Sequence, residues 1–151
     1  MRRERHGRAT RAPVLKALCL QESPVIYKGS CHCQNVTFEV EAPEKLEADY
    51  CNCSVCSKSG YLHLIVPLSK FRLLSGETSL STYTFGTGVA KHTFCKVCGV
   101  KPFYTPRSNP DGLDINVNCL DTKPASVNVS NFDGQNWEKH AHKVAHKSKE
   151  T

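Results

Sequence analysis

The sequence predicts an all-β protein: a small fold of twisted antiparallel sheets, stabilised by bound metal and followed by a short C-terminal helix. After Pro24, short β-type runs alternate with glycine, proline and other turn residues. Seven of the nine cysteines lie in three tight clusters, a pattern typical of structural metal sites. The frequent prolines and glycines argue against any long helix before the C-terminal stretch.

The expected strands follow one another along the chain with turns between them. In the run 35–40, Val36, Phe38 and Val40 alternate with other residues and therefore face one side of a sheet. The other β-type runs are 25–27, 61–66, 71–74, 80–85, 90–94, 100–105 and 113–120. A loop rich in turn residues, 106–112, precedes the last of them.

The two ends of the chain differ in character from this β domain, which is expected over residues 25–131. Residues 1–24 carry six basic and two acidic side chains, so a basic, disordered leader is expected there. Within residues 132–151, Trp137, Ala141 and Val144 recur at helical spacing. This spacing predicts an amphipathic helix and tail, with Trp137 docked against the β domain.

The cysteine clusters are spaced to hold metal ions. In an extended segment residues i and i+2 point the same way, so Cys31 and Cys33 present both sulfurs to one side. The two residues between Cys95 and Cys98 allow a tight turn that brings both sulfurs onto one ion. The cluster 51–56 combines the two spacings.

Disulfides and iron–sulfur clusters are the competing interpretations. The odd number of cysteines, the absence of a secretory leader and the closeness of the clustered cysteines in sequence argue against disulfides. We therefore expect an intracellular protein, cytoplasmic or nuclear and not secreted. Neither common ferredoxin cysteine run is present, so zinc is preferred to an iron–sulfur cluster.

Counting ligands divides the seven thiols into two zinc sites per chain. A structural zinc takes four ligands, which the outer clusters supply: Cys31, Cys33, Cys95 and Cys98. The remaining thiols, Cys51, Cys53 and Cys56, form a three-ligand site with a position open to substrate or water. In the alternative that stays open, one of His32, His63, His92 and Cys119 closes this second site. Cys119 is otherwise expected to pack as a small buried apolar side chain.

The net charge of +6 does not indicate nucleic-acid binding by the β domain. Residues 25–131 carry ten basic and nine acidic side chains. Ionising seven cysteines around two Zn²⁺ makes this region slightly acidic, which is a poor surface for nucleic acid. No apolar run approaches membrane-spanning length, so no membrane partner is expected.

Four ordered segments resemble the glutathione-dependent formaldehyde-activating enzyme family: 29–33, 51–58, 92–99 and 103–110. The resemblance covers roughly residues 25–140. It implies an all-β zinc fold with a structural zinc on the outer clusters and a catalytic-type zinc on Cys51, Cys53 and Cys56, which agrees with the ligand count. One departure is Gln34, where the family usually has glycine, and Asn35 is expected to adopt the positive φ instead.

The family implies a carbon–sulfur lyase that condenses formaldehyde with glutathione to S-(hydroxymethyl)glutathione, and catalyses the reverse. The alkoxide that develops needs a proton, and the sequence offers His32, His63 and His92 as donors. Arg107 is expected to pair with a carboxylate of a glutathione-like substrate. Members similar to centromere protein V, which this chain resembles most, are implied to organise chromosomes and the spindle. The rival hypothesis is therefore a non-catalytic, zinc-stabilised interaction module with protein partners.

Overall fold

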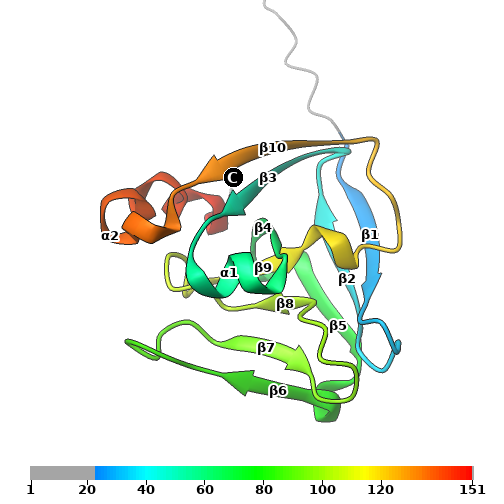
Figure 1. The fold of residues 1–151 in the computed structure, drawn as a ribbon. Helices are drawn as coiled ribbons and strands as arrows, with labels where there is room; N and C mark the ends of the chain where they lie inside the picture. Colours follow the sequence, from blue (N-terminus) through cyan, green and yellow to red (C-terminus); the bar gives the residue numbers. More distant parts are fainter. Residues whose placement is uncertain (1–22, 151) are drawn as a thin grey trace, which may run out of the picture.

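A computed structural model describes residues 23–150, which form three β-sheets and a series of short helices (Figure 1). The first sheet is antiparallel, in the order β1 (Val25–Ser30), β2 (Thr37–Ala42), β5 (Phe71–Ser75). The second has the order β10 (Ser126–Phe132), β3 (Lys45–Cys51), β4 (Leu62–Pro67), β9 (Gly112–Asn116), β8 (Phe103–Tyr104). The third pairs β6 (Leu80–Tyr83) with β7 (His92–Cys95). The leader predicted for residues 1–24, with Cys19, lies almost entirely outside the described residues.

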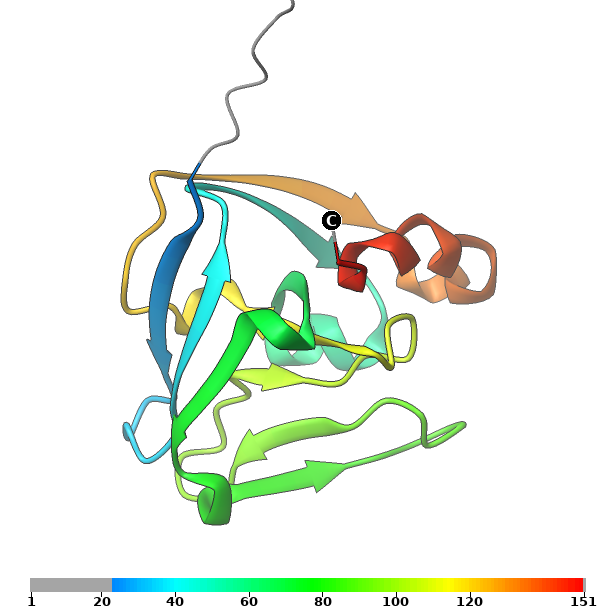
Figure 2. The same ribbon diagram turned by 180° about the vertical axis from the view of Figure 1, so that it is seen from behind.

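The all-β prediction is confirmed, but the second sheet is mixed. β10 runs parallel to β3, from the pair Ser126–Lys45 to the pair Phe132–Cys51, and both views show the two strands side by side (Figures 1 and 2). The last strand predicted within the β domain ended at residue 120, so β10 was missed. It is an edge strand whose Val129 is exposed, and it therefore lacks the apolar pattern of a buried strand. Its importance lies in bringing the chain after Phe132 beside the central cysteines.

The core lies between the first and second sheets. Phe38 and Phe71 of the first sheet pack with Phe103 of the second, with ring centroids 4.8–5.7 Å apart. Phe38 alternates with Val36 and Val40, and all three are fully buried, as the period-2 pattern predicted. This apolar layer supports the strand ends that carry the cysteines.

Short helices occupy the connections. The segment after Cys53 forms α1 (Ser54–Ser59), where the cysteine spacing predicted only a tight turn. It ends at Gly60, whose φ of 60° suits glycine. The other connecting helices are 3-10 turns: η1 (Leu68–Lys70), η2 (Glu77–Ser79) and η3 (Val117–Cys119). No helix in the described part of the chain is long and apolar enough to cross a membrane.

The C-terminal segment contains a short helix but is not one amphipathic helix. It consists of successive turns, η4 (Gly134–Asn136), α2 (Trp137–His140), η5 (Ala141–Lys143) and η6 (Ala145–Ser148). The fully buried Asn109 donates hydrogen bonds to the backbone oxygens of Val144 and Ala145, at 3.1 and 3.2 Å. Because these carbonyls bond to the 106–112 loop, the segment bends along the β domain instead of continuing as a straight helix.

Candidate metal centres and active site

The outer cysteine clusters meet in one group of four thiols. Cys31 and Cys33 follow β1, Cys95 ends β7, and Cys98 lies in the next turn. All four sulfurs lie within 4.8 Å of one another, with Cys31 Sγ to Cys33 Sγ at 3.6 Å and Cys33 Sγ to Cys95 Sγ at 3.7 Å. Burial raises the pKa of the Cys31 thiol to about 12. A dication would stabilise the thiolates, so the donor set fits the predicted tetrahedral zinc.

Two tight turns with left-handed residues form this first group. Gly99, directly after Cys98, has φ 75°, and its amide donates to the Cys95 carbonyl at 2.8 Å. In the other turn, Gln34 itself adopts φ 62°, so the expectation that Asn35 would take the positive φ is wrong. The Gln34 amide donates to the Cys31 carbonyl, which fixes the left-handed conformation at position 34.

The central cysteines form a second group at the end of β3. Cys51 is the last residue of β3, Cys53 precedes α1, and Cys56 lies within α1. Ligand atoms of Cys51, Cys56 and His63 lie within 4.8 Å of one another, and all three residues are buried. Cys53 is only half-buried and lines the adjoining cavity. The structure therefore places a histidine on β4 against the predicted three-thiol site.

The three central thiols are close enough to control one another's ionisation. Hydrogen bonds from Cys51 and Cys56 lower the pKa of Cys53 to about 2, whereas the Cys51 and Cys53 sulfurs raise the pKa of Cys56. The neighbouring sulfurs therefore disfavour ionisation of all three thiols together, and a bound cation would offset this repulsion. The chemistry of this donor set fits zinc, which prefers thiolate and imidazole ligands.

Gly134 packs directly against the central thiols and was missed in the sequence. A Cβ at this position would lie 2.3 Å from Cys51 Sγ and 2.9 Å from Cys53 Cβ. Hydrogen bonds hold this segment in place: Asn52 Nδ2 donates to Asp133 Oδ1, and the Gln135 amide donates to Asn52 Oδ1, both at 3.0 Å. No local motif marks Gly134, because its role arises only from the β10–β3 pairing.

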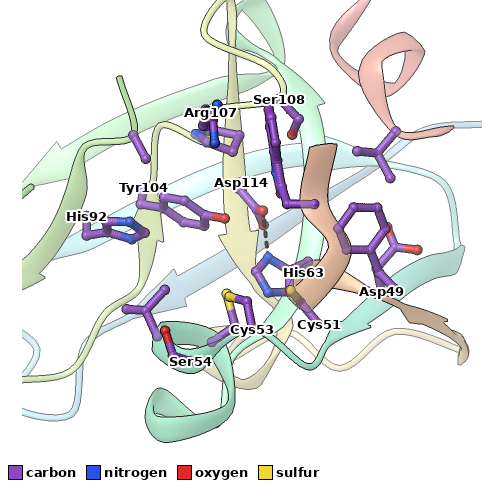
Figure 3. Close-up of a pocket in the computed structure, with 18 of the residues that line it drawn as sticks. Asp49, Cys51, Cys53, Ser54, His63, His92, Tyr104, Arg107, Ser108 and Asp114 are labelled. Atoms are coloured by element: carbon purple, nitrogen blue, oxygen red, sulfur yellow. Dashed lines mark hydrogen bonds and ion pairs between the residues drawn. The ribbon is translucent and has the colours of Figure 1, made fainter. Parts of the chain in front are cut away.

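His63 has a fixed orientation. Its Nδ1 lies 2.7 Å from Asp114 Oδ2, on the neighbouring strand β9, and His63 and Asp114 are 5% and 1% exposed (Figure 3). His63 Nε2 is buried and makes no hydrogen bond within the described residues. Asp114 was also missed, since an isolated aspartate in a β-type run carries no sequence signal. Strand pairing between β4 and β9 brings the two side chains together.

A cavity of about 450 Å³ opens above the central thiols. Its lining includes thiols, aromatic rings and charged side chains: Cys51, Cys53, Cys56, His63, Phe85, His92, Tyr104, Arg107, Asp114 and Trp137 (Figure 3). The outer group of four thiols does not contribute to this lining. The two thiol groups therefore differ: the outer group lies away from this cavity, whereas the central group faces a space large enough for a small molecule.

The remaining predicted site residues fall into different places. Arg107 lines the cavity, where its guanidinium lies 3.9 Å from the Trp137 ring centroid and pairs with Glu138 at 2.7 Å. His92 also lines the cavity, whereas His32 is exposed on the turn beside the outer group. Cys119 packs in the apolar core, as expected for a small buried side chain.

Comparison with known proteins agrees with this arrangement. The sequence matches the family of glutathione-dependent formaldehyde-activating enzymes over residues 26–138. The chain belongs to this family. A crystal structure of a Rhodobacter sphaeroides protein is 36% identical, with a TM-score of 0.58, over 67% of this chain and 99% of that one.

Membership in the formaldehyde-activating family supports a glutathione-related activity on formaldehyde, and the two thiol groups are consistent with zinc. The family match ends within α2, so it includes β10, Gly134 and Trp137. The narrower resemblance to centromere protein V stays a prediction.

Proposed function

We propose that this protein is a zinc-dependent carbon–sulfur lyase that forms or cleaves S-(hydroxymethyl)glutathione. The observation that carries the proposal is the asymmetry between the two thiol groups. Cys31, Cys33, Cys95 and Cys98 are four thiols in one compact group, whereas Cys51, Cys53 and Cys56 lie at a cavity of about 450 Å³. A structural zinc is closed by four protein ligands, and a catalytic zinc has three and faces the substrate.

A zinc ion on Cys51, Cys53 and Cys56 would lower the pKa of the substrate thiol and hold it as the nucleophilic thiolate. In the forward reaction a bond forms between the glutathione sulfur and the formaldehyde carbon. The S–H bond and the π bond of the carbonyl break: the thiol proton is released to solvent, and the carbonyl oxygen takes up a proton from solvent and becomes a hydroxyl. Cleavage reverses these steps, and neither direction involves oxidation or reduction.

His92 is suited to supply a hydrogen bond to the oxygen that develops charge. Lys101 Nζ lies 2.7 Å from His92 Nδ1, and an ammonium group can only donate, so the neutral ring carries its proton on Nε2. Burial and Lys101 lower the pKa of His92 to about 4, which keeps the ring neutral near pH 7. The ring stacks between Phe85 and Tyr104, at centroid distances of 5.3 and 4.9 Å. Its role is therefore that of a positioned donor rather than an imidazolium acid.

Arg107 is suited to bind a glutathione carboxylate at the cavity wall. The Trp137 ring supports one face of its guanidinium, and the Glu138 carboxylate pairs with it. Glu138 is largely exposed, with 76% of its side chain accessible, so this pair contributes little to stability. A substrate carboxylate could therefore replace Glu138 at small cost and form the planar, two-point contact that arginine favours.

Cobalt substitution tests the proposal directly. Glutathione is titrated into the Co²⁺ protein, with and without formaldehyde, and the sulfur-to-metal charge-transfer band is recorded. We expect a saturable increase that is lost in Cys53→Ser, together with faster formaldehyde–glutathione exchange in NMR spectra. Elemental analysis should give two zinc ions per chain. A fully metallated protein that neither responds to glutathione nor accelerates exchange would contradict the lyase and favour the rival interaction module.

A further inference from the structure

The second thiol group contains a fourth donor that the three-thiol description does not use. His63 is 5% exposed, and its ligand atom lies within 4.8 Å of those of Cys51 and Cys56. His63 Nδ1–H donates a hydrogen bond to Asp114 Oδ2, with the two atoms 2.7 Å apart, so the neutral ring has its lone pair on Nε2. That atom is buried and has no hydrogen-bond partner in the described residues. An unpaired buried lone pair beside two thiols is the arrangement that a metal ion completes.

We propose that His63, held by Asp114, is the fourth protein ligand of the second metal site when no thiol is bound, and that the substrate thiol displaces it. The first half of this inference concerns the chain alone. The second half rests on the proposed lyase function.

The Asp114 carboxylate provides an independent argument for a cation on the far side of the imidazole. Asp114 is 1% exposed, and its Oδ1 has no hydrogen-bond partner in the part of the chain that the structure describes. The neighbouring Tyr61 hydroxyl donates to the Asp114 backbone oxygen, at 2.6 Å, and not to the carboxylate. Its compensation is one hydrogen bond from a neutral imidazole and a longer-range attraction to Lys101, which is small for a charge at this depth. A metal on Nε2 polarises the ring and strengthens its bond to the carboxylate.

His63 is also the ligand best placed to leave. The three cysteines are joined by the short segment 51–56, and Gly134 packs against Cys51 Sγ and Cys53 Cβ, so the sulfurs have little room to move. Replacing an imidazole by a thiolate is favourable for a metal that prefers soft ligands, whereas exchanging one thiolate for another gains little. After displacement, His63 can keep its hydrogen bond to Asp114, the arrangement seen here. The entering thiol gives its proton to solvent, and nothing is oxidised or reduced.

X-ray absorption at the zinc edge tests the first half on the unmodified full chain. We expect an imidazole signature at the second site without thiol, which disappears when glutathione saturates the protein. In the Co²⁺ form, His63→Ala should lose the d–d bands of a site with nitrogen and sulfur ligands, and free imidazole should restore them. Asp114→Asn should weaken Co²⁺ binding about 10–100-fold, because the ring loses its oriented partner. His92→Ala is the matched control for these Co²⁺ measurements, since the His92 side chain is equally buried at 5% and its Nε2 also has no hydrogen-bond partner in the described residues.

Thiol affinity tests the second half. If His63 competes with the thiol, its removal should tighten glutathione binding to the metallated protein several-fold, whereas loss of a merely structural residue would weaken binding or leave it unchanged. No imidazole signature in the unmodified chain, with spectra of His63→Ala matching the parent, would overturn the inference even if glutathione binds. Clear His63 coordination in a protein that ignores glutathione would instead reject the lyase function and the displacement, leaving His63 as a permanent ligand.

Discussion

Replacing Gly134 by alanine places a methyl group against the second thiol group. The added Cβ would lie 2.3 Å from Cys51 Sγ and 2.9 Å from Cys53 Cβ. Non-bonded heavy atoms pack at about 3.5–4.0 Å, so the sulfur or the 132–135 segment must move by more than about 1 Å. Metal–ligand distances tolerate only about 0.2 Å. We therefore expect Gly134→Ala to lose the second metal and to be destabilised by about 1–3 kcal/mol, the usual cost of overpacking.

Gly112→Ala is the matched control for this prediction. Its Cβ would meet Ser148 Cβ at 2.5 Å and the Val66 carbonyl oxygen at 2.7 Å, a comparable clash that does not involve the cysteines. Urea unfolding followed by circular dichroism measures the stability of both variants, and elemental analysis measures their zinc. Gly112→Ala should lose similar stability but retain two zinc ions. If Gly134→Ala also retains two zinc ions at full affinity, the close packing of this segment on Cys51 does not control the site, and the reasoning fails.

Three further predictions concern stability. Cys95→Ser should abolish most thermal stability, because a metal in the outer group would join thiols 62 residues apart. Cys53→Ser should leave a cooperatively folded protein with one zinc, and equal losses in thermal melts would contradict this division. Gln34→Gly should raise the free energy of unfolding by about 1 kcal/mol, because glycine adopts the left-handed φ of 62° without the strain that a side chain causes. An unchanged urea midpoint would argue against strain at this position. Burial and Lys101 lower the pKa of His92 to about 4 in the native protein. As the pH falls, His92 of the unfolded chain therefore binds a proton at a higher pH than His92 of the native protein does. Stability from this group should be complete above the unfolded pKa of about 6.5 and decline towards pH 4, and His92→Gln should flatten that part of the stability curve.

The sequence alone determined the features that depend on spacing between near neighbours. The alternation of Val36, Phe38 and Val40 predicted a buried strand face, and all three side chains are fully buried. The paired cysteines likewise predicted two thiol groups, and the outer pairs do meet. These predictions succeeded because backbone geometry fixes where residues two or three positions apart can point, whatever the rest of the chain does.

Only the tertiary structure decided which distant residues complete the second site. Asp114 reaches His63 through the β4–β9 pairing, and Gly134 reaches Cys51 through the parallel β10–β3 pairing. Neither pairing can be recognised from neighbouring residues in the sequence. The β10–β3 pairing is hidden because β10 is an exposed edge strand, and the contact made through β4–β9 is hidden because Asp114 is a lone carboxylate in an apolar strand. The C-terminal segment bends for the same kind of reason, since the side chain of Asn109 bonds to its carbonyls. Contacts across a sheet depend on strand order and register, and the packing of the whole chain selects these.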